Sequence, residues 1–522
     1  MIRNPQDIPD GTVISEADQT SAAGAGFTAR VGGALVWTQL LRIVEVGTSA
    51  LFLIAVVRKL GPSEYGVFGI IMSVTAACNM LAIFGFSEVL SKYIPELSGD
   101  AKSSATAYIA QRILAVGLLL ALLCCAVLWI FREQIAGMLH YPGMSGLHPL
   151  IAVLVISQMV VALLSALNIG LWKAGTVFAI TGLVNILAAV GAIWLVYMGR
   201  ATGEAAALAT VVAFVLGMAA FIIGSRRWIF AIPHLKMDMK PIWRFSASAW
   251  LVRLSLFAMG SNIVVILICW LLGSRREVAF FNCAYVPLFR LQALILGWSV
   301  SVLPSLAELR AKLGASSLVV PYRIYVKVTV AVAAPTFLFV AWYAGSLITS
   351  LFGLQFVRAA VSLRVYAILS LIALLAGSGL TTMLLYSVGK ARAVGLMRAA
   401  TAVAHLGLSC WLILRYGALG AVIGIGLAAI VAACVEIGMA PASTRSGYPL
   451  GFIGKALAVA GGCLAVLSLF IPGTAVGLAL GGTAYVIAYA FLLARWKPLD
   501  DDERELLERH PTVARILTVF GV

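Results

Sequence analysis

The sequence predicts an all-α polytopic membrane protein with about 14 transmembrane helices. Of its 522 residues, 62% are hydrophobic and only 11% are charged, and the mean hydropathy is +1.03. A soluble domain has about a quarter charged residues, so the apolar surface of this chain needs lipid around it. Long unbroken apolar runs favour helices over an outer-membrane barrel, whose strands alternate. The composition also excludes a soluble enzyme, a disordered protein and a secreted disulfide scaffold.

Hydropathy over a window of about 19 residues predicts the spans one by one. Most are long enough for a tilted helix to cross a hydrocarbon core of about 30 Å. The connections between them are short and leave no room for a catalytic domain outside the membrane. The expected spans are 33–57, 65–90, 106–130, 149–171, 174–198, 204–224, 244–272, 278–304, 320–344, 361–388, 393–414, 417–440, 452–471 and 474–494.

Basic residues in the loops predict the orientation of the chain. With the N-terminus placed in the cytoplasm, 24 Lys and Arg lie in inside segments and 9 in outside segments. The positive-inside rule therefore favours a multi-pass protein of the inner (plasma) membrane with both termini cytoplasmic.

Two similar segments that start 212 residues apart indicate an internal repeat. Residues 60–68 (LGPSEYGVF) begin the second span, and residues 272–280 (LGSRREVAF) begin the eighth. Parallel repeats related by an axis along the membrane normal are a transporter architecture, with the substrate path between them. We expect a cytoplasmic tail, an N-lobe of six spans, a basic linker, a pseudo-symmetric C-lobe of six spans, two extra C-terminal spans and a cytoplasmic amphipathic tail, at 1–32, 33–224, 225–243, 244–441, 452–494 and 495–522.

Three motifs carry a resemblance to a known family. They are residues 58–68 (RKLGPSEYGVF), 351–356 (LFGLQF) before 363–365, and 384–390 (LLYSVGK) before 415–421 (RYGALGA). In this order they resemble the polysaccharide transporter family of O-antigen and exopolysaccharide flippases, within the multidrug/oligosaccharidyl-lipid/polysaccharide (MOP) superfamily. The resemblance implies two six-helix bundles around a central V-shaped cavity, with the last two spans appended.

The resemblance also implies a function. The expected activity is a flippase that moves a lipid-linked oligosaccharide or polysaccharide precursor across the inner membrane by alternating access, for biosynthesis of lipopolysaccharide or another surface polysaccharide. Its expected partners are this phosphate- or pyrophosphate-linked sugar, membrane lipid, and a polymerase or glycosyltransferases. The alternatives are a cation-coupled multidrug exporter of the same superfamily and a non-transporting scaffold of an envelope-polysaccharide assembly complex.

The charges within the spans distinguish the flippase from the exporter. Three acids, Glu45, Glu88 and Glu436, stand against four arginines. Ionisable groups inside a membrane mark substrate or ion pathways, so this balance favours an anionic cargo over cationic drugs.

No motif indicates catalysis or a cofactor. The chain has no His-Glu-x-x-His helix, Walker loop, zinc spacing or nucleophile elbow. The net charge of +16 would suggest nucleic acid in a soluble protein, but here the basic residues lie in short loops between spans. We expect no enzyme activity, no cofactor, no metal and no nucleic-acid partner.

Three arginines are the main candidates for a cationic substrate-binding cavity. Arg42 and Arg253 each lie about nine residues into spans that the repeat makes equivalent, roughly 14 Å from the cytoplasmic end. Arg290 lies near the middle of the eighth span. A guanidinium at this depth costs at least about 2.5 kcal/mol, so we expect it to face a wet cavity or a partner. Its planar fork of donors suits phosphate oxygens.

The resemblance places cavity arginines on the first, second and eighth helices, but the second helix here has none in its middle. Arg112, nearer an interface, is the candidate replacement, and its alternative role is to snorkel toward the headgroups. Neither Arg253 nor Arg290 has an acid within one helical turn, whereas Arg42 has Glu45 at i+3. Pairing with Glu45 is therefore the structural alternative for Arg42.

Glu88 and Lys92 are candidates for pairing or gating. They stand four residues apart at the cytoplasmic end of the second span, where a local ion pair is the ordinary role. The other interpretation is a gate between the lobes, facing Glu308 and Arg310 at the matching end of the repeat.

The orientation can be tested by labelling. The variant Gly143→Cys, in an expected outside loop, should react with a membrane-impermeant thiol reagent added outside. Lys236→Cys, in the expected inter-lobe linker, should not react. The reverse pattern would overturn the orientation drawn from the loop charges.

Overall fold

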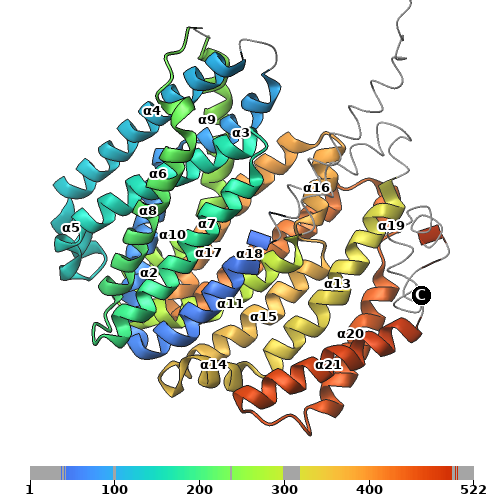
Figure 1. Cartoon of the computed structure of the whole chain (residues 1–522). Coiled ribbons are helices and arrows are strands. Elements are labelled where there is room, and N and C mark those ends of the chain that lie inside the picture. Colours follow the sequence, from blue (N-terminus) through green and yellow to red (C-terminus); the bar gives the residue numbers. More distant parts are fainter. Residues whose placement is uncertain are drawn as a thin grey trace, which may run out of the picture.

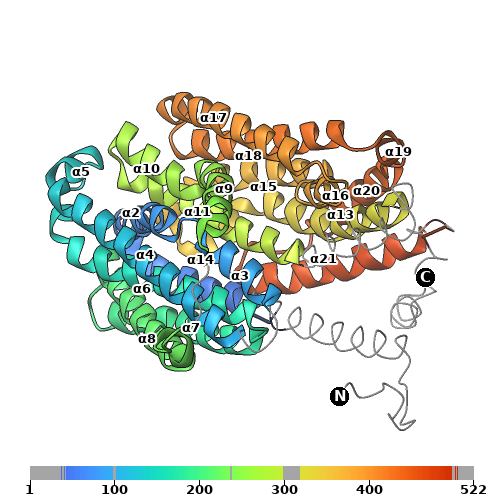
Figure 2. The ribbon, with the colours of Figure 1, turned by 90° about the horizontal axis from the view of Figure 1, so that it is seen from above.

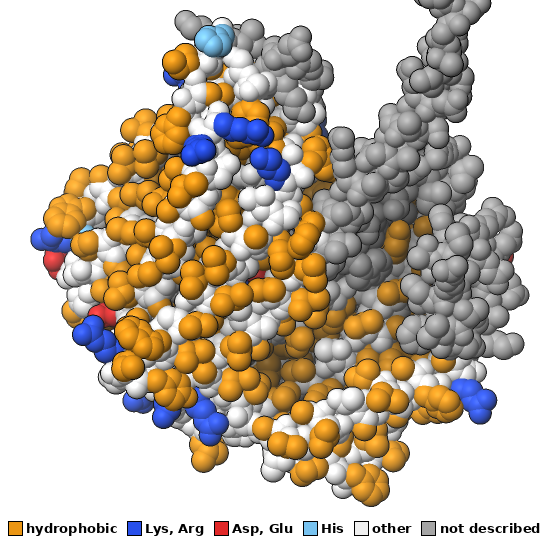
Figure 3. Space-filling view, viewed as in Figure 1, with side chains coloured by type: hydrophobic (Ala, Val, Ile, Leu, Met, Phe, Trp, Pro, Cys, Tyr) orange, Lys and Arg blue, Asp and Glu red, His pale blue; other side chains and the backbone are white. Residues whose placement is uncertain are grey.

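The described part of the chain is a bundle of helices. The computed structural model describes residues 43–97, 102–234, 238–297 and 318–496, and also 37, 40, 41, 500, 502 and 503. Every regular element within these ranges is helical, as the sequence predicts (Figure 1). Hydrophobic side chains cover most of the described surface in Figure 3, as expected of a surface that faces lipid.

The helices of the N-terminal half form one lobe, and those that follow form the second (Figure 2). The first lobe contains η1 (Leu53–Val57), α2 (Arg58–Ile83), α3 (Phe86–Glu96), α4 (Lys102–Ile130), α5 (Arg132–Met138), η2 (Pro142–Gly146), α6 (His148–Gly170), α7 (Ala174–Tyr197) and α8 (Gly203–Ile229). The second contains α9 (Lys240–Ala258), α10 (Ser261–Leu272), α11 (Arg275–Ile295), α13 (Val319–Trp342), α14 (Ala344–Phe352), η5 (Leu354–Phe356), α15 (Ala359–Leu375), α16 (Leu380–Ser387), α17 (Ala391–Tyr416) and α18 (Ala418–Met439).

Three more helices follow the second lobe. They are α19 (Ala442–Ser446), α20 (Leu450–Leu467) and α21 (Ala475–Arg495). Buried side chains from α13, α20 and α21 form a core of their own, which includes Tyr322 and Tyr485. The predicted division at 225–243 stays a prediction, and in the structure α8 continues into this segment and α9 begins before its end.

Twelve helices in the described ranges are long and apolar enough to cross a membrane, and a thirteenth is the bent pair α9 and α10. One of the twelve, Ile43–Ile83, is folded into two legs at Gly61, where φ is 73° and ψ is 171°. The rings of Phe52 and Phe68 lie 5.1 Å apart across this fold. A straight helix would separate them by about 24 Å. With the legs counted apart, the architecture agrees with the prediction of about 14 spans.

Two predicted spans are broken where the lobes meet. The second ends at Ile83, and α3 starts after the left-handed residues Phe84 and Gly85. The seventh is divided into α9 and α10, which are bent by 52°. A Cβ at Gly85 would lie 2.4 Å from the backbone oxygen of Ser246 in α9. Glycine therefore lets the α2–α3 junction contact α9 directly.

The two lobes share one hydrogen bond that identifies them as repeats. Glu64 Oε2 accepts from the backbone N–H of Gly203 at 2.9 Å, and Glu277 Oε2 accepts from that of Ala418 at 2.7 Å. Glu64 is the fifth residue of the first repeated segment, and Glu277 is the sixth residue of the second. Gly203 and Ala418 begin the last helix of each lobe. A carboxylate at a helix N-terminus satisfies an otherwise unpaired N–H group and the helix dipole.

We predict that the two caps stabilise their lobes to a similar extent. Glu64→Ala and Glu277→Ala should each lower the free energy of unfolding by about 1–2 kcal/mol, because each leaves a helix N-terminus without its acceptor. The measurement is the thermal unfolding midpoint in detergent. The control is Glu133→Ala, whose exposed side chain pairs only with its neighbour Arg132. Unfolding midpoints equal to that of the control would contradict the shared role.

Candidate functional site

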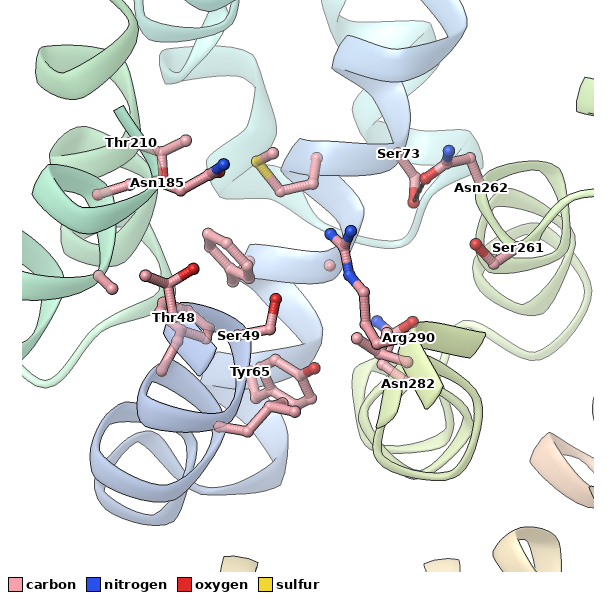
Figure 4. A pocket seen from close by; sticks show the side chains of 18 residues that line it. Thr48, Ser49, Tyr65, Ser73, Asn185, Thr210, Ser261, Asn262, Asn282 and Arg290 are labelled. Atoms are coloured by element: carbon pink, nitrogen blue, oxygen red, sulfur yellow. Dashed lines mark hydrogen bonds between the residues drawn. The ribbon is translucent and has the colours of Figure 1, made fainter. Parts of the chain in front are cut away.

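A cavity of about 320 Å³ lies between the two lobes (Figure 4). Its walls come from the first leg, α2, α7 and α8 on one side and from α10 and α11 on the other. Most of its polar side chains are uncharged: Thr48, Ser49, Ser73, Asn185, Thr210, Ser261, Asn262 and Asn282. Ser73 Oγ donates to Asn262 Oδ1 at 3.4 Å, so α2 and α10 are joined across the cavity. These hydroxyl and amide groups can replace the hydration of a polar ligand.

Arg290 is the one charged residue among the described residues that line this cavity. Its side chain extends from α11 toward the middle of the cavity in Figure 4. The guanidinium Nη1 lies 3.7 Å from Glu45 Oε2 on the first leg, and both side chains are more than half buried. At this distance the two groups form an ion pair, but they are too far apart for a hydrogen bond. The acid that neutralises Arg290 thus comes from the other lobe. Sequence reasoning missed it because it considered only acids within one helical turn of the arginine.

Arg253 also pairs with an acid of the first lobe. Its Nε lies 2.5 Å from Glu88 Oε1, so the pair joins α9 to α3. Nearby, the Trp250 indole donates to the backbone oxygen of Met80 at 3.1 Å and stacks on Phe84 at 5.1 Å between ring centroids. These interactions form what we call the α3–α9 contact.

The predicted local ion pair between Glu88 and Lys92 is not found in the structure, because each of these side chains has a partner in the second lobe. Lys92 Nζ lies 4.3 Å from the ring centroid of Phe245 in α9 and 5.0 Å from that of Tyr93. A cation over an aromatic face is stabilised there, and the carboxylate remains for the Arg253 guanidinium. Lys92 and Glu88 therefore both reach the second lobe. The expected gate partners Glu308 and Arg310 lie outside the described residues.

The other two candidate arginines, Arg42 and Arg112, are not found among the described residues that line the cavity. Arg42 lies outside the described residues, and its expected partner Glu45 is paired with Arg290. Arg112 lies on an exposed face of α4, with its guanidinium 5.4 Å from the Tyr108 ring, and does not line the cavity. Its position fits the snorkelling alternative.

A second cavity, of about 580 Å³, lies inside the C-lobe and shares Ser261 and Asn262 with the first. Its charged groups are Arg398 and Glu436, whose Nη2 and Oε1 atoms lie 3.2 Å apart. Thr382 Oγ1 donates to Glu436 Oε2 at 2.7 Å and accepts from Arg398 Nη2 at 2.8 Å. Glu436 is 2% exposed, so the pair is internally neutralised.

Sequence reasoning missed the role of Arg398 because the loop count scored it as an inside residue. The signal was present, since 398 falls within the expected span 393–414 and a charge within a span needs a partner.

Comparisons with known proteins agree with this geometry. A family model described as polysaccharide biosynthesis protein matches residues 34–310. Among solved structures, the chain is similar to the lipid II flippase MurJ in an inward closed conformation, with a TM-score of 0.68, 13% identity, and coverage of 88% of this chain and 98% of that chain. Comparison with curated protein sequences gives no match.

Two further similar structures are transporters. An inward-facing multidrug resistance MATE family transporter of the MOP superfamily gives a TM-score of 0.58 at 17% identity, over 80% of this chain and 95% of that one. A MOP superfamily transporter from Pyrococcus furiosus gives 0.50 at 16% identity, over 82% and 96%. At such identities the structures show a shared fold.

The α3–α9 contact should control access to the cavity. In a variant without the native cysteines, Ser73→Cys should react slowly with a water-soluble thiol reagent, because Ser73 is 2% exposed. Adding Glu88→Gln or Arg253→Gln should speed the reaction several-fold, and the charge exchange Glu88→Arg with Arg253→Glu should slow it again.

The control for this experiment is Lys173→Gln, which removes a charge at the N-cap of α7 that is not one of the residues of the α3–α9 contact. A rate that rises equally in the control, or that stays unchanged in both pair variants, would show that the contact does not close the cavity.

Proposed function

Because the chain belongs to the polysaccharide biosynthesis protein family, we propose that it is a flippase for a lipid-linked oligosaccharide or polysaccharide precursor that carries phosphate or pyrophosphate. The chain is a multi-span membrane protein with the fold of MOP superfamily transporters. One observation carries the proposed cargo: Arg290 is the one charge among the described lining residues, and uncharged polar groups surround it.

The polar groups of the cavity suit the sugar and the phosphate of such a cargo, the two parts that must leave water. Hydroxyl and amide groups can hydrogen-bond to sugar hydroxyls, and a guanidinium can hold phosphate oxygens with two parallel hydrogen bonds. The lipid tail would stay in the bilayer, which solvates it.

The size of the cavity supports alternating access. Its volume of about 320 Å³ lies at the small end of the range of about 300–1,000 Å³ for pockets that hold drug-sized ligands, and an oligosaccharide is larger than such ligands. The lobes touch on both sides of it: α3 contacts α9, and a Cβ at Gly66 of α2 would lie 2.0 Å from the backbone oxygen of Arg275. The lobes must therefore separate on one side to admit the cargo.

The cross-lobe ion pairs give this separation a chemical logic. When the lobes part, Glu45 and Glu88 move away from Arg290 and Arg253. The two guanidinium groups would then be unpaired at membrane depth, which is unfavourable unless another anion replaces the carboxylates. A phosphate or pyrophosphate group is such an anion, so cargo binding would offset the loss of both pairs.

The α3–α9 end is the cytoplasmic end in this proposal, as the loop charges predict, and the membrane is the inner membrane. Surface-polysaccharide enzymes such as a polymerase or glycosyltransferases would supply or consume the cargo.

The MATE neighbours share the fold, so a cation-coupled multidrug exporter is the second candidate. An organic cation needs an anionic cavity. No carboxylate is among the described residues that line the inter-lobe cavity, and Glu45 beside it is paired with Arg290. Glu436 in the second cavity is already neutralised by Arg398. These charges favour the flippase.

The test is export of surface polysaccharide by cells that depend on this protein. Arg290→Ala should lower export about tenfold or more, because a charged hydrogen bond to phosphate is worth about 1.5–3 kcal/mol. Arg290→Lys should retain part of the export, since it keeps the charge but loses the fork. Membrane insertion and monodispersity in detergent report that each variant is folded.

Two variants separate cargo binding from a structural role. Glu45→Gln removes the partner of Arg290 but leaves the guanidinium for the cargo, so its export should stay well above that of Arg290→Ala if the arginine serves the cargo. Arg112→Ala, on the exposed face of α4, is the matched control and should export normally. Wild-type export by the double variant Arg253→Ala with Arg290→Ala would end the proposal.

A further inference from the structure

A third cavity, of about 400 Å³, lies away from the inter-lobe cavity, where α13, α20 and α21 come together at one end of the bundle. Three basic residues line it: Arg323 and Lys327 from the first turns of α13, and Lys455 from the start of α20. The Lys327 side chain is 6% exposed, whereas Lys455 is exposed. Such a buried ammonium group needs an anion beside it.

The chain supplies this anion from beyond α21. Lys327 Nζ lies 2.6 Å from Glu503 Oε2 and 3.0 Å from Asp500 Oδ2. Arg323 Nη1 lies 3.4 Å from Asp500 Oδ2. The hydrogen bond from Lys327 lowers the pKa of the Asp500 carboxyl, so this carboxylate stays charged. Two carboxylates thus occupy the position of a doubly charged anion.

The fit of the carboxylates is incomplete. Glu503 Oε1 is buried without a hydrogen-bond partner, and the nearest guanidinium atom recorded for it, Arg323 Nε, is 3.8 Å away. Within the part of the chain that the structure describes, three basic side chains face two acidic ones, which leaves an excess of positive charge. A tetrahedral anion with three or more acceptor oxygens can satisfy more of these donors than two separate carboxylates can.

The surroundings of the pocket are those of a lipid headgroup site. Phe452 and Trp496 line it, and Leu450 at its mouth is 70% exposed. Tryptophan is enriched at the membrane–water interface, where an apolar ring meets the headgroups. The outer face of α21 below the pocket is apolar, with Phe491 62% exposed. Acyl chains could lie along this face while the phosphate enters the pocket.

We propose that this pocket binds the phosphate headgroup of an anionic phospholipid, which competes with Asp500 and Glu503 for Lys327 and Arg323. The competition is reciprocal: an anion that neutralises Lys327 favours release of the carboxylates, and their release favours binding of the lipid. The pocket is separate from the inter-lobe cavity and the inference does not depend on the transported cargo.

The test uses the full-length protein in detergent with phosphatidylglycerol as the anionic probe and phosphatidylcholine as the neutral one. Native mass spectrometry counts retained lipids, and thermal unfolding measures stabilisation. Asp500→Asn with Glu503→Gln should retain phosphatidylglycerol at several-fold lower concentration than the wild type. Phosphatidylglycerol should also raise its unfolding midpoint by more than it raises that of the wild type.

Further variants assign the effect to the pocket. Adding Lys455→Gln to the double variant should remove most of the gain in lipid retention. This exposed lysine would meet the headgroup, and it forms no ion pair with the described residues. Arg392→Gln, an exposed arginine at the start of α17, is the matched control and should leave the gain unchanged. If the double variant does not fold, Asp500→Asn alone leaves Glu503 on Lys327 and should show a smaller gain of the same kind.

Three results would overturn the proposal. One is equal retention of phosphatidylglycerol and phosphatidylcholine by the neutralised variant. Another is a gain that Lys455→Gln does not change. The third is full stabilisation by inorganic phosphate alone, which would make a soluble anion the ligand.

Discussion

The proposed movement of the two lobes depends on two ion pairs. Each pair joins a carboxylate of the first lobe to a guanidinium of the second. Glu45 meets Arg290 beside the inter-lobe cavity, and Glu88 meets Arg253 in the α3–α9 contact. At the membrane depth that the sequence predicts for both arginines, leaving them unpaired is unfavourable. In the proposed function, an anionic cargo therefore favours separation of the lobes, which makes it part of the conformational equilibrium.

Each lobe contains a hydrogen bond that joins its own helices. Glu64 and Glu277 tie the start of one helix to the start of the last helix of the same lobe, by the same hydrogen bond in both repeats. The breaks in the helices lie elsewhere, at Gly85 and at the bend between α9 and α10. The broken helices thus lie at the boundary between lobes, where movement is needed, and the caps lie within the lobes.

Much of this architecture could be predicted from the sequence, because lipid imposes long apolar helices and penalises charges within them. The spans, the repeat and the choice of Arg253 and Arg290 as candidates follow from those constraints. The partners could not be predicted, since Glu88 and Arg253 are 165 residues apart and nothing local links them. The uncharged lining of the cavity was also missed, because Ser73 and Asn262 resemble ordinary packing residues until the lobes are assembled. Arg398 was assigned to a loop although it is only 21% exposed and pairs with the buried Glu436.

The central claim is that an anionic cargo group replaces the carboxylates that hold the lobes together. Spin labels on Ser91→Cys in α3 and Ser248→Cys in α9, both exposed positions, report the separation of the lobes in lipid vesicles. The protein for this measurement lacks its eight native cysteines. We expect a sugar-bearing polyprenyl pyrophosphate to shift the distance distribution to longer values, and Arg290→Ala to abolish the shift. A polyprenol of the same length without phosphate should have no effect. An equal shift with the neutral lipid, or no shift with the pyrophosphate, would contradict the claim.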